Sequence, residues 1–466
     1  QRIVAMSAAV KPGTGEVLGL AADRPYGDKS KANPLLSKVN YPIHSFLQPG
    51  STFKAFTLAT ALKQGIGIHL RLYAPPCYHS DVFANPQPGD CFHNAGDSEA
   101  GTFDVVSGTA NSVNTFFIQL EEKTGVLAVK QTAEDMGIPD SSQFDVVQGQ
   151  ERPILADVDA SRGSLTIGGL TYGAPAIDMA TGYATLAAHG LECDPHGIVD
   201  ITDAKGKPVA WTQPAACHQA LDPSVADTVT SVLENVLTYG TAAGKGLAGR
   251  PAAGKTGTTD DQAAAWFVGY TPQQIAMAVA MGDPQHPSTP MGAVTEGGGN
   301  VVDPVFGGTI PADIWQMAMN AALAGKPVVP LPAAVGTVAN GKTAPIPSVV
   351  GDTLDEARSV LSGSGFTVSV TAKPIDSDVP AGRVAAQDPS GYGPVGDIVY
   401  LTLSTGKHPK PSKSPHPGNG GGPGGGPGGG PPAPPTPTPA VTPTEPAAPP
   451  TDSPPPPSDS GSPPSG

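Results

Sequence analysis

The segment from Ser51 to Lys54 places a hydroxyl and an amine three positions apart in the chain. Residues at this spacing share one face of a helix, so the Lys54 amine would lie beside the Ser51 hydroxyl. A lysine in a desolvated pocket has a lowered pKa and can take the proton of a serine. Backbone N–H groups at the start of that helix would face an oxyanion formed at the serine. The segment therefore predicts serine-based acyl transfer.

A second segment, Ser112-Val113-Asn114, offers a hydroxyl and an amide two positions apart. On its own this pattern carries little information, because Ser-x-Asn is common in helix caps and turns. It gains weight from its position, since it lies between the Ser51 motif and a lysine motif further along the chain. We interpret it as a second polar element of the same site.

The third segment, from Lys255 to Thr258, has the sequence Lys-Thr-Gly-Thr and opens a strand-like run. On a strand Lys255 and Gly257 share one face, while Thr256 and Thr258 share the other. A cation and a hydroxyl at the edge of a strand suit the capture of a substrate carboxylate. The three segments together predict a nucleophile, its base and an anion-binding strand.

Two other segments have similar sequences but a different context. The run from Ser404 to Lys407 has the spacing of the first motif, yet it ends a small module and leads into a Pro/Gly-rich tail. Lys123-Thr124-Gly125 falls where a helix should end, and we interpret Gly125 as its C-cap. Neither segment is expected to carry chemistry.

The elements that must position these motifs form one domain of the α+β class, residues 1–325. Strands are expected near both ends of this region and helices between them, which favours a mixed, mostly antiparallel sheet flanked by helices. Pro-Gly before Ser51 and Gly after Gln64 mark the start and the end of a helix. This helix is apolar almost all round and is hence expected to be buried. A second helix is expected from about Phe103 to Lys123. The expected strands are Ile3–Ala8, Glu16–Leu20, Gly254–Thr259, Ala265–Tyr270 and Ile275–Met281.

Beyond the first domain the composition changes twice. Residues 326–344, rich in Pro, Ala, Val and Gly, are expected to form a linker, and residues 345–405 a small α+β module with one helix and several strands. Residues 406–466 consist largely of Gly and Pro, of which the chain has 59 and 54. That tail cannot bury a core and is predicted to be disordered.

Charge and hydropathy exclude several functions. The chain has 26 basic and 41 acidic residues and a net charge of −15, so nucleic-acid binding is not expected. No uncharged apolar run reaches the length of a membrane span. The chain begins directly in a β-like pattern without the layout of a signal peptide, which suggests a fragment of a longer protein.

Four cysteines fall into two local pairs, and they suggest disulfides Cys77–Cys91 and Cys193–Cys217. Four cysteines allow three connectivities, and four buried thiols are a further alternative. Disulfides would place the chain outside the cytosol. The cysteines lack the close pairs and histidine spacing of a zinc site, so neither a metal nor a cofactor is expected.

The three motifs in this order resemble the transpeptidase domain of penicillin-binding proteins. The resemblance spans residues 1 to about 325, and Met179-Ala180 with the run 183–186 adds a helix typical of the class A branch. Residues 345–405 resemble a PASTA module. One departure is Ala263-Ala264-Ala265, where relatives of this family are expected to carry an acidic residue. The matching segments are Gln-Pro-Gly-Ser-Thr-Phe-Lys at 48–54, Ala-Gly-Lys-Thr-Gly-Thr-Thr at 253–259 and Trp-Phe-Val-Gly-Tyr-Thr-Pro at 266–272.

The resemblance implies a role for each motif residue. Ser51 would be the nucleophile and Lys54 its base, while Ser112 and Asn114 would relay protons and bind the substrate amide. Lys255 would belong to the catalytic set as the third motif's cation. Its neighbours on the strand, Thr256, Gly257 and Thr258, would bind substrate. The backbone N–H groups of Ser51 and Thr258 would form the oxyanion hole.

The function implied is a D,D-transpeptidase that cross-links peptidoglycan stem peptides and is acylated by β-lactams. Partners would be stem peptides, β-lactams and, through the module, cell-wall glycan. The domain would lie outside the cytoplasm in the cell envelope, anchored to the membrane only through a missing amino-terminal segment. Two alternatives stay open: a D,D-carboxypeptidase or β-lactamase on the same scaffold, and a non-catalytic sensor of β-lactams or wall fragments. A class A β-lactamase would need a Glu-x-x-Leu-Asn string, which Glu134 and Glu151 do not provide.

Overall fold

The computed structural model describes residues 2–31, 33–83, 90–96, 99–147, 150–212, 216–295 and 299–408. They belong to one compact unit that runs from Gln1 to Pro409. The tail that the sequence predicts to be disordered lies outside the described residues from position 409 onward. Within the described part of the chain, no helix combines the length and the apolar character that a membrane span requires.

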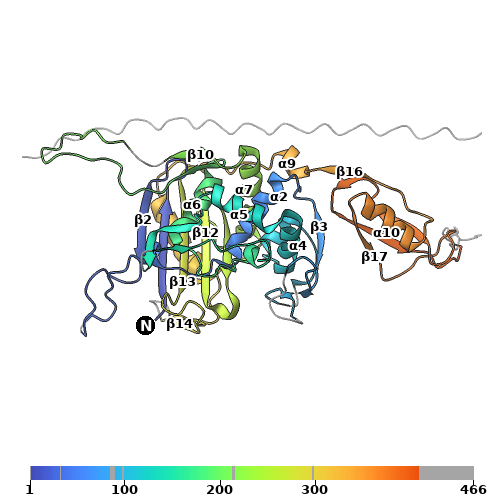
Figure 1. The fold of residues 1–466 in the computed structure, drawn as a ribbon, viewed down its shortest axis with the longest axis horizontal. Helices are drawn as coiled ribbons and strands as arrows, with labels where there is room; N and C mark the ends of the chain where they lie inside the picture. Colours follow the sequence, from blue (N-terminus) through green and yellow to red (C-terminus); the bar gives the residue numbers. More distant parts are fainter. Residues whose placement is uncertain are drawn as a thin grey trace, which may run out of the picture. The chain divides into compact units, whose positions relative to one another are not determined.

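A five-stranded antiparallel sheet forms the centre of the first domain (Figure 1). The amino-terminal hairpin joins the strands from the far end of the domain because β1 pairs with β13, with Ala8 opposite Ala278. The predicted meeting of the two sequence ends in one sheet is confirmed. In spatial order the strands are β11 (Ala253–Thr258), β12 (Ala264–Thr271), β13 (Ile275–Gly282), β1 (Val4–Val10) and β2 (Val17–Ala22).

Helices cover both faces of this sheet. Alternate residues of β12 point to opposite sides: Trp266 belongs to the core that includes α2 and α6, whereas Phe267 packs against Trp315 of α8. Strands buried on both faces read as continuous apolar runs, which explains the sequence of β12 and β13. The covering helices are α6 (Ala176–Ala187), α7 (Pro223–Thr238) and α8 (Ile310–Ala322), and α2 (Lys54–Lys63) packs against α7.

The helix that the sequence predicts from Phe103 to Lys123 is interrupted, so this prediction is wrong. Residues Gly101–Asp104 form strand β6, and α3 (Val105–Ala110) is separated from α4 (Asn114–Thr124) by a short turn. Ser112 in that turn has a φ of 59°, a left-handed conformation that ends a helix. Apolar periodicity continues across the turn, which is why the break was not visible in the sequence. The expected C-cap at Gly125 is confirmed.

Smaller elements complete the first domain. Short antiparallel pairs, β3 with β6 and β4 with β5, lie in the region between α2 and α3. These elements are α1 (Tyr41–His44), β3 (Arg71–Ala74), β4 (Cys77–Tyr78), β5 (Phe92–His93), α5 (Val126–Asp135), β7 (Ser141–Val147), β8 (Gln150–Pro153), β9 (Leu191–Cys193), β10 (Cys217–Gln219), β14 (Val294–Thr295) and β15 (Val301–Val302).

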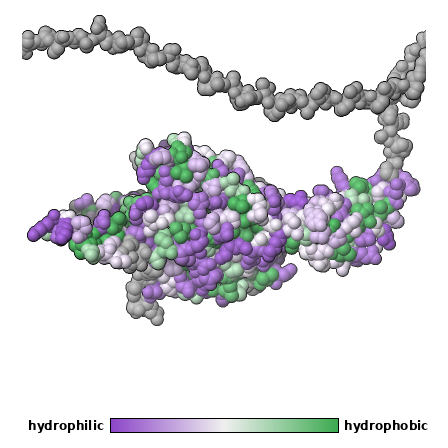
Figure 2. Space-filling model, turned by 90° about the horizontal axis from the view of Figure 1, so that it is seen from above, coloured by the Kyte–Doolittle hydropathy of each residue, from purple (hydrophilic) through white to green (hydrophobic). Residues whose placement is uncertain are grey.

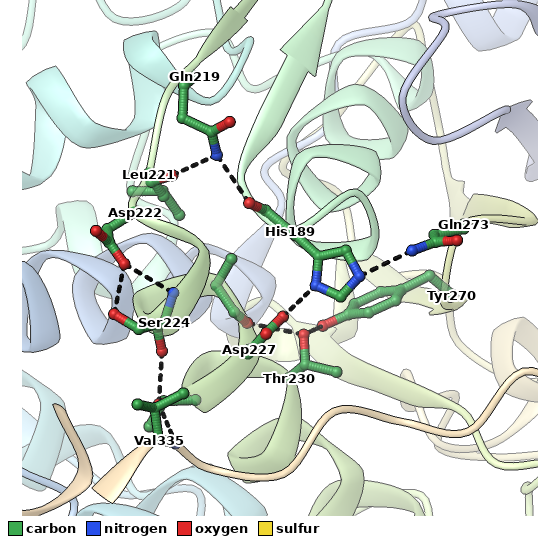
Figure 3. A network of polar contacts seen from close by, with 12 residues as sticks. His189, Gln219, Leu221, Asp222, Ser224, Asp227, Thr230, Tyr270, Gln273 and Val335 are labelled. Carbon is green, nitrogen blue, oxygen red and sulfur yellow. Dashed lines mark hydrogen bonds and ion pairs between the residues drawn. The ribbon is translucent and has the colours of Figure 1, made fainter. Parts of the chain in front are cut away.

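A polar network ties the end of α6 to the rest of the domain (Figure 3). The His189 imidazole lies between Asp227 of α7, at 2.5 Å from Nδ1, and Gln273 of the β12–β13 turn, at 2.9 Å from Nε2. Thr230 of α7 bonds the Tyr270 hydroxyl at 2.8 Å. These contacts fix α7 against the sheet, one strand of which carries the lysine motif.

Both expected disulfides are present. Each cysteine is bonded to its neighbour in sequence, as predicted. Cys77–Cys91 joins β4 to the start of β5, and Cys193–Cys217 crosses the pair β9–β10. The first of these closes the loop that leads to Asn94. That residue accepts a hydrogen bond from the backbone N–H of Thr115 in α4. The disulfide therefore stabilises a loop that is attached to the helix carrying Asn114.

Replacing both Cys77 and Cys91 by serine should lower the free energy of unfolding by about 3 kcal/mol, because the closed loop of about 15 residues is freed in the unfolded chain. Chemical denaturation followed by circular dichroism measures the change. The matched pair of variants at Cys193 and Cys217 should behave similarly. An unchanged unfolding free energy for both pairs would show that the bridges do not constrain the unfolded chain.

The carboxy-terminal module has its own small core, which includes Val349, Leu361 and Leu401. In one sheet β17 pairs parallel and β18 antiparallel with β20, while β16 pairs with β19. The helix and strands follow the expected pattern. They are β16 (Thr343–Ile346), α10 (Leu354–Gly363), β17 (Thr367–Val370), β18 (Val384–Asp388), β19 (Gly391–Pro394) and β20 (Ile398–Leu403).

The segment expected as a linker contacts the first domain. It holds a short helix, α9 (Gly336–Asn340), and the N–H of Ile68 donates to the carbonyl of Ala339 at 2.8 Å. In the module, the nearly buried Asp397 carboxylate accepts hydrogen bonds from Arg71 of β3, from the backbone N at 2.9 Å and from Nη2 at 3.0 Å. Such a bidentate, charge-assisted pair is a directional contact.

Polar residues are spread over the face that Figure 2 displays, with smaller apolar areas between them. Large exposed apolar side chains come from separate parts of the chain, among them Tyr26, Val199 and Met317. Single exposed apolar residues are an ordinary feature of protein surfaces.

Candidate active site

The structure brings the three polar motifs together around Ser112. The Lys54 ammonium nitrogen, Nζ, lies 2.5 Å from the Ser112 carbonyl oxygen, 3.2 Å from Ser112 Oγ and 2.7 Å from Asn114 Oδ1. Lys255 Nζ lies 2.8 Å from Ser112 Oγ and 3.1 Å from the Thr256 carbonyl oxygen. One hydroxyl thus links the amines of two lysines that stand far apart in sequence.

Ser51 lies in the turn just before α2. Residues Gly50–Phe53 form a 3-10 helix, and the α-helix begins at Lys54, so the predicted single helix starts with a tighter turn. The Ser51 side chain is partly exposed, and within the described residues its hydroxyl makes no hydrogen bond. The neighbouring side chains Thr52, Phe53 and Lys54 are all buried. Ser51 is therefore the residue of this turn that solvent and substrate can reach.

Two glycines let the third motif lie directly on this turn. A Cβ atom at Gly257 would stand 2.2 Å from the Pro49 carbonyl oxygen, a distance that real side chains do not adopt. Gly50 has a φ of 56°, and a Cβ there would stand 3.0 Å from the backbone N of Thr258. The backbone of β11 and the turn of Ser51 are in contact, so both backbones border one space.

The turn at Ser112 adopts a conformation that serine rarely takes. Its φ of 59° lies in the left-handed region, where a side chain other than glycine costs about 1 kcal/mol or more. In this conformation both the carbonyl and the hydroxyl oxygen of Ser112 lie within hydrogen-bond distance of the Lys54 amine. The hydroxyl oxygen also contacts the Lys255 amine. Strain of this kind is found at functional sites, where the surrounding structure holds it in place.

Burial lowers the pKa of both lysines. Desolvation, followed by repulsion from Lys255, lowers the pKa of Lys54 well below its ordinary value. Desolvation also lowers the pKa of Lys255, to about 7. Because the charge of Lys255 adds to the desolvation of Lys54, a neutral amine is favoured at Lys54, while Lys255 still holds its proton in part near pH 7. Two groups whose surroundings move their pKa values apart can divide the roles of base and cation between them.

The remaining residues of the third motif have separate contacts. The Thr256 hydroxyl is turned toward Thr241, with its Oγ1 at 2.6 Å from the partner oxygen. Thr258 Oγ1 accepts a hydrogen bond from the backbone N–H of Gly307 at 3.1 Å. Thr256 is buried, whereas Thr258 is partly exposed at the end of β11. Of the two threonines, Thr258 is the better placed to meet a substrate.

Tyr183 is a positioning residue for which the sequence analysis gave no role. Its hydroxyl donates a hydrogen bond to the Thr52 carbonyl oxygen at 2.7 Å, and the side chain is fully buried in α6. It thereby fixes the carbonyl of the residue that follows Ser51. A tyrosine in an otherwise small and apolar helix was the available signal, since a buried Tyr hydroxyl requires a partner.

The two look-alike segments lie elsewhere. Ser404 belongs to the module, where its hydroxyl donates to the Val379 carbonyl oxygen at 2.6 Å. Thr124 and Gly125 close α4. Neither segment lies in the group of contacts around Ser112.

One group of side chains among the described residues has the spacing of a metal site, namely Cys77, Cys91 and His93. The two sulfur atoms are joined in a disulfide and hence are not thiolate ligands. The histidine lies against the bridge, with Nε2 at 3.3 Å from the sulfur of Cys91.

Residues 5–308 match the family of the penicillin binding protein transpeptidase domain. The chain belongs to this family. Residues 345–405 match the PASTA domain family. The carboxy-terminal module therefore has the family that its sequence suggested.

Named relatives agree with this membership. Penicillin-binding protein 1A of Mycolicibacterium smegmatis is 31% identical over 318 residues, which cover 64% of this chain and 37% of that protein. Penicillin-binding protein 1A of Mycobacterium tuberculosis is 33% identical over 306 residues, 62% of this chain and 34% of that protein. The chain thus spans little more than a third of the length of these curated relatives.

Solved structures show the same fold. The penicillin-binding protein PonA1 from Mycobacterium tuberculosis superposes with a TM-score of 0.59 at 29% identity, covering 75% of this chain and 84% of that chain. The structure of PonA1 in complex with penicillin V gives a TM-score of 0.58 at 26% identity, covering 74% of this chain and 85% of that chain.

Proposed function

We propose that this chain is a D,D-transpeptidase domain that cross-links peptidoglycan stem peptides through an acyl-enzyme at Ser51. The observation that carries the proposal is the convergence of Lys54, Ser112 and Lys255, with the partly exposed Ser51 in the turn that leads into Lys54, in a member of the penicillin-binding protein family. In this reaction the serine oxygen attacks the carbonyl between two D-alanines. The bond to the last D-alanine breaks, and an amine of a neighbouring peptide then takes the acyl group.

Each motif has one task in this mechanism. Neutral Lys54 accepts the proton of Ser51, and Ser112 carries a proton toward the leaving amine because its hydroxyl contacts both lysines. Asn114 orients Lys54 through Oδ1, and its proposed second task is to bind the substrate amide. Charged Lys255 attracts the carboxylate of the substrate. Substrate then lies along β11, which brings Thr256, Gly257 and Thr258 to it.

An oxyanion hole is proposed at the backbone N–H groups of Ser51 and Thr258. The close approach of Gly50 to the backbone of Thr258 supports this assignment, because it puts the two segments side by side. Backbone donors that are fixed before the reaction stabilise the developing negative charge.

A donor thioester that ends in a D-alanine analogue, mixed with an amino acceptor, tests the proposed function. Chromatography with mass detection should find the transfer product in addition to the hydrolysed donor. Hydrolysis alone would make the domain a carboxypeptidase or β-lactamase. Absence of both products, with reversible binding of the donor, would make it a sensor.

The acylation rate should follow a bell-shaped pH profile. Lys54 acts as a base only when neutral, so the rate should fall as the pH drops through its lowered pKa. Lys255 attracts a carboxylate only when charged, and because its pKa is about 7 the rate should also fall at higher pH. Stopped-flow acylation with a fluorescent penicillin measures the profile. A rate that keeps rising far into the alkaline range would contradict the role of Lys255.

We propose that the domain works outside the cytoplasm in the cell envelope, since two disulfides require an oxidising compartment. The full-length protein would be held to the membrane by a segment that precedes this sequence. Cell-wall glycan is the proposed partner of the PASTA module.

The module at 345–405 should be dispensable for acylation, because its contacts with the first domain involve Arg71 and Thr102 rather than the three motifs. A chain ending at Lys342 keeps α9, whose contacts with Ile68 belong to the first domain. Its acylation rate by penicillin should stay within about tenfold of the full chain, which is ~1.4 kcal/mol in the barrier. A larger fall would mean that the module completes the site.

A further inference from the structure

The helix that carries Asn114 begins without a capping side chain of its own. Asn114 is the first residue of α4, and Val113 before it makes no side-chain hydrogen bond to the first turn. The first N–H groups of a helix have no partner within the helix and must find one elsewhere. Because Asn114 Oδ1 accepts a hydrogen bond from Lys54 Nζ at 2.7 Å, a shift of this turn would move an acceptor of the proposed base.

A side chain from another part of the chain supplies the missing cap. Asn94, which directly follows β5, accepts a hydrogen bond from the backbone N–H of Thr115 through Oδ1 at 2.9 Å. The Thr115 hydroxyl oxygen lies 3.2 Å from the same Oδ1 and donates to the carbonyl of Pro75 at 2.8 Å. Asn94 Nδ2 donates to that carbonyl as well, at 3.2 Å. The amide of Asn94 thus joins the first turn of α4 to the residue that follows β3.

The backbone next to Asn94 orients the Asn114 side chain itself. Asn114 Nδ2 donates to the carbonyl oxygen of His93 at 2.9 Å. A carbonyl can only accept, so this contact directs the amide nitrogen toward His93 and leaves Oδ1 for the lysine. His93 is paired with Cys77 across β4 and β5, and the disulfide from Cys77 to Cys91 holds this pair together.

Burial makes the cap difficult to replace. Thr115 and Lys54 are fully buried, and Asn94 is partly buried. A buried N–H group that loses its acceptor carries a desolvation penalty, which favours a shift of the turn toward another partner. Small displacements of groups that a reaction requires in fixed positions lower its rate strongly.

We propose that Asn94 is a positioning residue of this site, which caps α4 and thereby holds the Asn114 amide oxygen at the Lys54 amine. The inference rests on the proposed function, because that function makes Lys54 the base. The hydrogen bonds of Asn94 join it to backbone groups and to the Thr115 hydroxyl. Its effect is therefore on the geometry of the site, and it takes no part in proton transfer.

Stopped-flow acylation of the full chain over a range of fluorescent penicillin concentrations tests the proposal, because it separates the binding constant from the maximal rate. Asn94→Ala should lower the maximal rate by about tenfold or more. The binding constant should stay within about threefold, since β11, the proposed substrate-binding strand, is unchanged.

Two further variants at this position examine the cap itself. Asn94→Asp keeps an acceptor for the helix N–H group, and Asn and Asp cap helices about equally well, so its rate should return to within about threefold of the wild type. Rates are compared at the maximum of each pH profile, so that the added charge does not obscure the comparison. Asn94→Gln retains the amide but displaces it by one methylene group. It should also lower the maximal rate, and it replaces Asn94→Ala if that variant does not fold.

Asn320→Ala is the matched control. Asn320 Oδ1 accepts a hydrogen bond from the backbone N–H of Ala248 at 2.9 Å, a contact of the same kind and length that lies outside the three motifs. A thermal melt should show a loss of stability comparable to that of Asn94→Ala. The acylation rate should stay within about twofold of the wild type.

Four outcomes would overturn the proposal. An unchanged maximal rate in Asn94→Ala would show that the cap does not position the base. Equal rate losses in Asn94→Ala and Asn320→Ala would indicate general destabilisation. Weaker binding at an unchanged maximal rate would assign Asn94 to substrate binding, and a loss that Asn94→Asp does not recover would exclude capping as the cause. Failure of the proposed function itself would appear in the wild type, which would then form no acyl-enzyme with penicillin.

Discussion

Ser51→Ala should abolish covalent labelling by a fluorescent penicillin. The strained lactam resembles the amide that Ser51 is proposed to attack, and a chain without this hydroxyl would lack the proposed nucleophile. The variant should remain folded, because Ser51 is partly exposed and its hydroxyl bonds to no described residue. Gel fluorescence after a brief exposure measures labelling, and a thermal melt checks folding.

Ser404→Ala is the matched control, because Ser404 begins a segment with the same spacing as the nucleophile motif. This variant should label as the wild type does. Its lost hydrogen bond to Val379 affects the module alone. Labelling that survives in Ser51→Ala and disappears in Ser404→Ala would reverse the assignment.

Lys54→Met should slow acylation by about a hundredfold to ten-thousandfold, the usual contribution of a positioned base. Methionine approximates the length of the lysine stem and removes the amine that contacts Ser112 and Asn114. It also removes a buried group whose charged form burial disfavours, so loss of folding is not the expected cause. Stopped-flow acylation measures the rate.

Lys63→Met provides the control for this helix. Lys63 ends α2 and pairs with Asp135 at 3.3 Å on the surface. Its replacement should leave the acylation rate unchanged within about twofold, because a surface ion pair contributes little. If both lysine variants slowed acylation equally, the effect of Lys54→Met would come from α2 as a whole and the base would have to be sought elsewhere.

Most of the fold could be predicted from the strand patterns in the sequence. The continuous apolar runs of β12 and β13 and the hairpin at the amino terminus were predicted, as was the sheet that joins them. The break between α3 and α4 was not predictable, because it depends on a left-handed φ at Ser112. That conformation is held by contacts with Lys54 and Lys255, which only the tertiary structure brings near.

The residues of the candidate site were likewise only partly predictable from the sequence. Its motif residues were recognisable because their types and spacing are specific in combination. Tyr183 was not recognisable in this way, because its place in the site depends on a tertiary contact with the Thr52 carbonyl. A single sequence contains no period or spacing that joins residues of this kind, so only the folded arrangement reveals them.

The most direct test of the central claim is to map the penicillin adduct on the wild-type chain over time by mass spectrometry. We expect a single acyl adduct on the peptide that contains Ser51, persisting for minutes or longer. An adduct on Ser112 or Ser404, or no adduct, would contradict the assignment of the nucleophile. An adduct on Ser51 that disappears within seconds, with hydrolysed penicillin as the product, would contradict the transpeptidase and favour a β-lactamase.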